Sequence, residues 1–256
     1  MVTRLKGLDV AASAICAALY AAVGYMIWLF LPITTPGIGI VRFWPSVIIP
    51  AAFAVLFGPL VGGLGAALGI FVSDMLIHGN PLLSLTAGVT SNFLGFYLIG
   101  YFSRRKVEWT KLISVSSLVI MIISLGSLAT ISYIALPNWA VNGLNLFTTI
   151  LVATFMIAIV IGFLWPDWRS YQLGSMIGLG AGSIIIGLVV WAFSQVFYLP
   201  AAVGGGFQLP FYYALLETVW TFATEIPFLV LLGPPIVKAC YRAFPSLKPV
   251  EERKSL

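Results

Sequence analysis

The chain has 256 residues, of which 61% are hydrophobic and only 8% are charged. A soluble globular domain carries roughly 25% charged residues because its surface faces water, so this composition excludes a soluble domain. Lipid offers no hydrogen bonds to the backbone, and the apolar runs are too long and too uniform for barrel strands. We therefore predict an all-α, polytopic transmembrane bundle of about six to eight helices.

Eight apolar runs are candidate membrane spans. They cover residues 10–31, 40–57, 60–78, 82–102, 112–136, 143–164, 172–198 and 211–236. The first run exceeds the roughly 7–15 residues of a signal-peptide core, so we expect a retained helix. The second and third runs are short and are joined by Gly58-Pro59, so they could instead form one re-entrant pair. No connecting segment is long enough for a soluble domain, and we expect residues 1–256 to form a single membrane domain.

The basic residues indicate the orientation of the chain in the membrane. With the amino terminus inside, the outer segments hold only Arg42, and all other basic residues are inside: Arg4, Lys6, Arg104, Arg105, Lys106, Lys111, Arg169, Lys238, Arg242, Lys248, Arg253 and Lys254. Cytoplasmic loops carry such an excess of Lys and Arg. Both termini are therefore predicted to be cytoplasmic, with 238–256 a basic tail, and the net charge of +5 needs no nucleic acid as a partner.

Several kinds of chemistry are excluded by missing residues. The single histidine excludes multi-histidine metal and haem sites, and no Gly-x-x-x-x-Gly-Lys-Ser/Thr sequence exists to bind ATP. Cys16 and Cys240 fall in a helix and at a cytoplasmic end, so neither a disulfide nor a zinc site is expected. We expect no enzyme, no cofactor and no metal, although a membrane enzyme without a recognisable catalytic motif stays possible.

Small residues follow one face of three predicted helices. On the first helix, this face is formed by Ala14, Ala17, Ala18, Ala21 and Ala22. Such a face allows close helix approach, either within this chain or to a partner subunit, and both possibilities stay open. Two further strips are predicted to pack inside the chain; they are Gly58, Gly62, Gly65, Ala66 and Gly69, and Gly174, Gly178 and Gly182.

Ionisable residues at membrane depth are costly and usually functional. Asp74 and His78 share one face near the outer end of the third span, and Glu217 and Glu225 lie within the last span. Thr221 and Thr224 extend the polar stripe between these two glutamates. Arg42 could pair with Asp74, which would make these charges structural. The candidate substrate-binding residues are Arg42, Trp44, Asp74, His78, Asn92, Glu217 and Thr221. Trp44 also belongs to the aromatic residues near span ends that fit an interfacial belt.

The first part of the chain, residues 1–105, resembles the substrate-binding S components of energy-coupling factor (ECF) transporters. The resemblance lies in the Ala-x-x-x-Ala pattern of the first helix, the sequence Arg42-Phe43-Trp44-Pro45, and the turn Phe57-Gly58-Pro59-Leu60-Val61-Gly62. It implies that the Ala face docks a membrane coupling (T) subunit and that residues 32–43 form a lid over an outward-facing pocket. Family members usually have six helices, fewer than the eight apolar runs counted here. The family's cobalt and nickel subgroup has a histidine at position 2, where this chain has Val2.

We therefore expect a subunit of the cell membrane that binds a vitamin or related micronutrient. The coupling subunit and two ATPase subunits would supply the energy. A solitary secondary transporter coupled to ions through Glu217 and Glu225 is the alternative, and a membrane enzyme or assembly scaffold is a third. Acidic residues favour a cationic or hydrogen-bond-donating substrate, whereas Arg42 could bind a carboxylate or phosphate.

Overall fold

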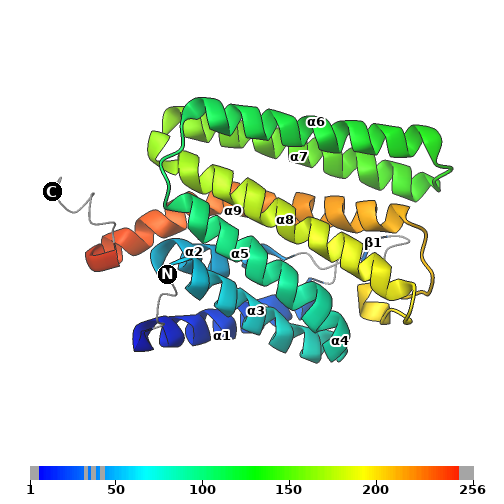
Figure 1. Cartoon of the computed structure of the whole chain (residues 1–256), viewed down its shortest axis with the longest axis horizontal. Helices are drawn as coiled ribbons and strands as arrows, with labels where there is room; N and C mark the ends of the chain where they lie inside the picture. The colour runs from blue at the N-terminus through cyan, green and yellow to red at the C-terminus, as the bar shows by residue number, and fades with distance from the viewer. Residues whose placement is uncertain (1–5, 32–33, 36–38, 41–43, 248–256) are drawn as a thin grey trace.

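The computed structural model describes residues 6–31, 34–35, 39–40 and 44–247. They form an all-α bundle, as predicted (Figure 1). Seven segments in this part of the chain are long and apolar enough to cross a membrane: α1 (Gly7–Phe30), α3 (Pro59–Ile77), Pro81–Ser103, α6 (Trp109–Tyr133), α7 (Asn138–Leu164), Pro166–Ser194 and α9 (Tyr212–Ala243). The chain is a multi-pass membrane protein.

Two of these segments are composite. The segment Pro81–Ser103 contains α4 (Pro81–Leu83), the π-helical turn η2 (Ser84–Val89) and α5 (Thr90–Ser103). In the segment Pro166–Ser194, the short η3 (Pro166–Trp168) leads into α8 (Arg169–Ser194). The other short elements of the described chain are β1 (Thr34–Thr35), β2 (Gly39–Ile40), η1 (Pro45–Val47), α2 (Ile48–Leu56), η4 (Ala201–Val203) and η5 (Pro245–Leu247).

The predicted second span, residues 40–57, is wrong as a full helix. Its helical part is α2, whose nine residues rise about 14 Å, roughly half of a hydrocarbon core. Pro45 starts a single 3₁₀ turn ahead of α2, and β2 pairs with β1 where a continuous helix was expected. Hydropathy identified the segment as apolar, but it cannot distinguish half a helix from a whole one.

The directions of α1 and α3 show how the chain crosses the membrane. Gly65 of α3 lies against Ser13 and Cys16 of α1, and Gly69 lies against Ala17 and Tyr20. Both sets of numbers increase together, so the two helices are parallel. The chain between them therefore returns to its starting side, and α2 forms the inner part of that return. Seven long helices and this one return give eight crossings, which excludes the re-entrant alternative.

Both described ends of the chain lie at one end of the bundle (Figure 1). Arg104 and Arg105 also lie there, next to the turn between α2 and α3, where the Arg104 guanidinium donates a hydrogen bond to the Val55 carbonyl at 3.3 Å. The positive-inside rule assigns this end, called the inner end below, to the cytoplasm. One boundary needs correction: α9 continues to Ala243, so Lys238 and Arg242 lie in that helix and not in a tail.

The inner half of the bundle is held by glycines, as the two internal strips predicted. Gly62 leaves no room for a Cβ beside Ala54, which brings α2 against α3. Gly178 likewise lies against the Gly95 carbonyl and Ile99, so α5 and α8 meet backbone to backbone. Lipid tails are as apolar as leucine, so close packing of this kind is what favours helix association in a bilayer.

Three prolines interrupt the hydrogen bonds of α9, and its neighbour α8 compensates for one of them. Pro234 has no N–H, so the carbonyl of Val230 loses its helical donor. The side-chain amide of Gln172, which is fully buried, donates to that carbonyl at 3.1 Å. The Tyr171 hydroxyl donates to the neighbouring Leu229 carbonyl, also at 3.1 Å. These contacts connect α8 to the inner half of α9.

The contact between α5 and α8 yields a stability prediction. In Gly178→Ala, the new Cβ would lie 2.7 Å from Ile99 Cγ1 and would collide with the Gly95 carbonyl, so the helices must separate. We expect a loss of about 1–3 kcal/mol in unfolding free energy, measured by denaturation in detergent. Gly180→Ala is the matched control on the same helix, because its Cβ meets only the Phe222 ring at 3.6 Å. Equal stability of the two variants would contradict the close contact.

Candidate functional site: a polar cavity within the bundle

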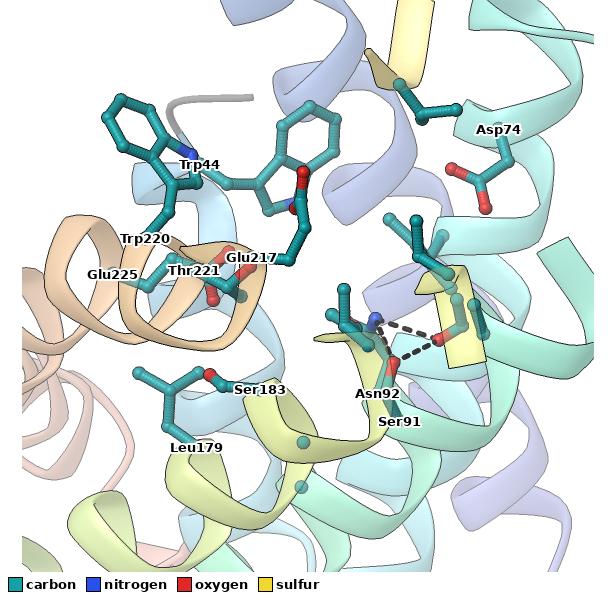
Figure 2. A pocket seen from close by; sticks show the side chains of 18 of the residues that line it. Trp44, Asp74, Ser91, Asn92, Leu179, Ser183, Glu217, Trp220, Thr221 and Glu225 are labelled. Atoms are coloured by element: carbon teal, nitrogen blue, oxygen red, sulfur yellow. Dashed lines mark hydrogen bonds between the residues drawn. The ribbon is translucent and has the colours of Figure 1, made fainter. Parts of the chain in front are cut away.

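A cavity of about 130 Å³ lies among α1, α3, η2, α5, α8 and α9 (Figure 2). It extends from His78 and Val203 near the outer end to Leu179 and Glu225 at mid-depth. Its polar or aromatic lining residues are Tyr20, Trp44, Asp74, His78, Ser91, Asn92, Phe96, Ser183, Glu217, Trp220, Thr221 and Glu225. No residue of α6 or α7 lines it. Its described ionisable acid and base side chains are three carboxyl groups and one imidazole, without a lysine or arginine.

Asp74 is held in the cavity wall by two neighbours. Ser84 donates its hydroxyl hydrogen to Asp74 Oδ2 at 2.6 Å, and His78 Nε2 lies 3.7 Å from Asp74 Oδ1. The backbone N–H of Asn80 donates to His78 Nδ1, so the neutral imidazole carries its hydrogen on Nε2, toward Asp74. Gly88 has no Cβ, which would lie 2.6 Å from Asp74 Oδ2. The sequence therefore provides both a hydrogen-bond donor and the space that this carboxylate needs.

The π-helical turn contains both residues, Ser84 and Gly88, that lie at the Asp74 carboxylate. It widens the helix over Ser84–Val89 and lies directly against the end of α3 that carries Asp74. π-turns inside α-helices occur frequently at functional sites. Ser84 and Gly88, four residues apart in this turn, both lie against the Asp74 carboxylate, and Ser91 and Asn92 follow on the cavity side of the next turn.

Aromatic side chains from α1 and its return segment form a second wall. The Tyr20 ring lies between Trp44 and Phe96, edge-on to both, at centroid distances of 6.2 and 6.1 Å. The Tyr20 hydroxyl donates to Asn92 Oδ1 at 2.8 Å, and the Asn92 amide donates to the Gly88 carbonyl. Only 3% of Trp44 is exposed. Trp44 therefore does not belong to an interfacial belt, and this part of the belt prediction is wrong.

The third wall comes from α8 and α9. Glu217, Thr221 and Glu225 occur every fourth residue, so they follow one face of α9 and all line the cavity. Thr224 is not among the lining residues, so its inclusion in the polar stripe is wrong; its hydroxyl donates to the Trp220 carbonyl of its own helix at 2.9 Å. Ser183 of α8 faces this stripe in Figure 2.

The segment between α8 and α9 covers the outer end of the cavity. Ala202 and Val203 of η4 line the cavity, and the following residues Gly204, Gly205 and Gly206 all have positive φ angles, which only glycine adopts without strain. Hydrogen bonds hold this segment to α8, such as that from Trp191 Nε1 to the Leu209 carbonyl at 3.1 Å. β2 lies against η4. Two connecting segments therefore meet above the site.

Most of the predicted substrate-binding residues come together here. Trp44, Asp74, His78, Asn92, Glu217 and Thr221 line one cavity, although they come from four separate parts of the sequence. Arg42, its proposed pairing with Asp74, and most of the predicted lid at 32–43 lie outside the described residues.

The sequence analysis missed several lining residues: Tyr20, Ser91, Ser183 and Trp220. It left Glu225, another lining residue, outside the candidate set. Spacing could have identified both Trp220 and Glu225, because Trp220 lies three residues after Glu217 and Glu225 lies four residues after Thr221 on α9. Nothing in the local sequence distinguishes Ser183 from the other serines of α8.

The Ala face of the first helix divides into two parts. Ala21 is buried and Ala17 half-buried, on the side toward α3, whereas Ala14, Ala18 and Ala22 are exposed. The exposed three follow each other at four-residue intervals and form a smooth strip on the outside of the bundle. Of the Ala face, only this exposed strip can contact another chain.

No protein-family model, no curated protein and no solved structure matches this chain.

The bond from Ser84 to Asp74 can be tested by mutation. Ser84→Ala removes a hydrogen bond to a buried carboxyl group, so we expect unfolding free energy to fall by about 1.5–3 kcal/mol. Thr86→Ala in the same π-turn is the control, since its hydroxyl bonds only to carbonyls of its own helix. Thermal denaturation in detergent compares the two. A loss no larger for Ser84→Ala than for Thr86→Ala would show that this bond does not hold Asp74.

Proposed function

We propose that this protein is the substrate-binding S component of an ECF-type transporter of the cell membrane, and that it takes up a vitamin or related micronutrient. The observation that carries the proposal is the cavity, which gathers polar groups and aromatic walls within a membrane bundle. Small-molecule sites combine apolar walls with a few polar groups that fix orientation. Carboxylates at membrane depth are costly unless they serve such a site.

The arrangement of helices supports the same proposal. All cavity-lining residues of the described chain lie at or before Ile99 or from Leu179 onward. The helices α6 and α7 form a hairpin on the far side of α8 and α9 (Figure 1). Without this hairpin, the bundle consists of α1, α2, α3, the Pro81–Ser103 span, α8 and α9. Those are six helices, the number usual in S components, which accounts for the larger helix count expected from the sequence.

Transport would need partners in this proposal. The chain contains no P-loop, so ATP would be hydrolysed by two ATPase subunits connected through a membrane coupling subunit. The exposed Ala14, Ala18 and Ala22 strip suits the coupling subunit, because small side chains allow a neighbouring backbone to approach closely.

Reconstitution in proteoliposomes tests the proposal against its alternatives. Uptake that needs the coupling and ATPase subunits together with ATP would support it. Uptake by the isolated chain that an ionophore abolishes would favour the secondary transporter, and turnover of a compound without uptake would favour an enzyme. Mass spectrometry of small molecules that co-purify with the protein would identify the substrate to use.

Glu217 gives a prediction about binding. It lies five residues after the start of α9, about 8 Å along the helix, whereas Glu225 lies about 12 Å deeper. Glu217→Gln keeps the size of the side chain but removes its charge, so we expect substrate binding to weaken by about 1.5–3 kcal/mol in calorimetric titration. Glu225→Gln, the comparison, should affect binding less and transport or stability more. An unchanged dissociation constant for Glu217→Gln would show that the charge of this residue does not contribute to substrate binding.

The exposed strip gives a prediction about transport. Ala18→Leu puts a bulky side chain on the exposed face of α1, where a partner helix would pack, and Ala18 does not line the cavity. Transport should fall while the isolated protein binds substrate as before, and co-purification with the coupling subunit should be lost. Ala129→Leu, on the exposed face of α6, is the control and should change neither. Full co-purification of Ala18→Leu with the coupling subunit would place the docking surface elsewhere.

A further inference from the structure

We propose that the molecule bound in the cavity contains a single planar heteroaromatic ring and accepts a hydrogen bond from the α8–α9 wall through a ring nitrogen or carbonyl. This inference rests on the proposed function only in taking the cavity as a binding site. Three observations carry it: two hydrogen-bond donors without an acceptor, a set of fixed aromatic rings, and the size of the cavity.

The α8–α9 wall holds two donors that find no acceptor among the described residues. These are the Ser183 hydroxyl and the Trp220 indole N–H, and the residues are only 1% and 6% exposed. A buried donor without a partner costs about 1–3 kcal/mol, and most buried polar side chains avoid this cost. Both residues line the cavity. An acceptor on the bound molecule would satisfy either donor.

The two donors are at one level of the bundle. Gly180 of α8 lies beside Phe222 of α9, and Gly187 lies beside Thr218, so the antiparallel register puts Ser183 level with Trp220. The indole is also fixed in place from behind, since Phe147 of α7 packs edge-on to it at a centroid distance of 4.5 Å. A donor with a fixed direction selects for an acceptor at a defined position. Phe147 is thus a positioning residue for this wall.

The opposite wall favours a flat ring. Tyr20 is held by Trp44 and Phe96, and its hydroxyl is already bonded to Asn92. Rings fixed in this way present aromatic edges and faces, which pack best against another aromatic ring. The cavity volume of about 130 Å³ is close to that of a cavity of about 150 Å³ that holds one benzene molecule. One six-membered ring therefore matches the size of the cavity.

Three probes of one size separate these requirements. Pyridine has a planar ring and an acceptor, benzene has the ring alone, and tetrahydropyran has an acceptor on a saturated ring. Each is titrated into the full-length protein in nanodiscs with ¹⁵N-labelled tryptophan, at a pH where pyridine carries no proton. The indole N–H signal of Trp220, identified by its loss in Trp220→Phe, reports on the contact directly. Pyridine should shift this signal and bind about 2–10-fold more tightly than either other probe, the range of one hydrogen bond.

Variants test whether Ser183 contributes. Ser183→Ala should weaken pyridine binding by about 2–10-fold and leave benzene binding unchanged. Ser175→Ala, another fully buried serine of α8 that lies outside the cavity, should change neither. The inference is overturned if benzene or tetrahydropyran binds as tightly as pyridine, or if pyridine leaves the Trp220 signal unmoved. It is independent of transport: failed ATP-driven uptake with intact pyridine binding would refute the transporter proposal alone.

Discussion

Close contact between helix backbones is the constraint on which the rest of this structure depends. In a bilayer the hydrophobic effect does not drive helices together, so association depends on packing and on hydrogen bonds within the bundle. Gly65, Gly100 and Gly178 bring α1, α2, α3, α5 and α8 to distances that no larger residue would allow. These contacts lie in the inner half of the bundle, where the helix backbones pack closely.

The inner half is closely packed, and the polar groups of the bundle gather in the outer half around the cavity. Asp74, Glu217 and Glu225 lie at depths where an isolated charge would be expensive. They are acceptable because they line a shared cavity and not lipid. The same division suits a protein that binds its substrate from outside: the polar residues lie on the open side of the glycine contacts. Moving the substrate inward would require those contacts to rearrange, which agrees with the need for an external source of energy in the proposed function.

The sequence predicted those properties that depend on composition and helical period. Charge content gave the class, and the lysine and arginine distribution gave the common side of both termini. Asp74, His78, Glu217 and Thr221 were identifiable because a polar residue in an apolar run is conspicuous. The sequence could not show that α2 is half a helix, since an apolar run has the same hydropathy whether helical or extended.

The π-turn at Ser84 and the position of Trp44 were also beyond prediction. A π-turn adds one residue to a helical turn without a compositional signal, yet this turn carries both Ser84 and Gly88, which lie at Asp74. Trp44 lies near a predicted span end, and its burial depends on Gly24 of α1, whose missing side chain leaves space for the indole. Ser183 is distinguished by a buried hydroxyl that finds no hydrogen-bond acceptor among the described residues, and only the three-dimensional structure shows this.

The hairpin of α6 and α7 illustrates how helices outside a site can still shape it. Neither helix lines the cavity, and α6 is the least buried of the long helices. Yet α7 packs Phe147 against Trp220 and Phe155 against Phe222, both on α9. The hairpin thus supports the cavity wall that holds the unsatisfied indole. Changes in α7 would alter the direction of one hydrogen-bond donor and leave the residues that line the cavity unchanged. In the proposed function, specificity would therefore depend in part on residues that do not line the site.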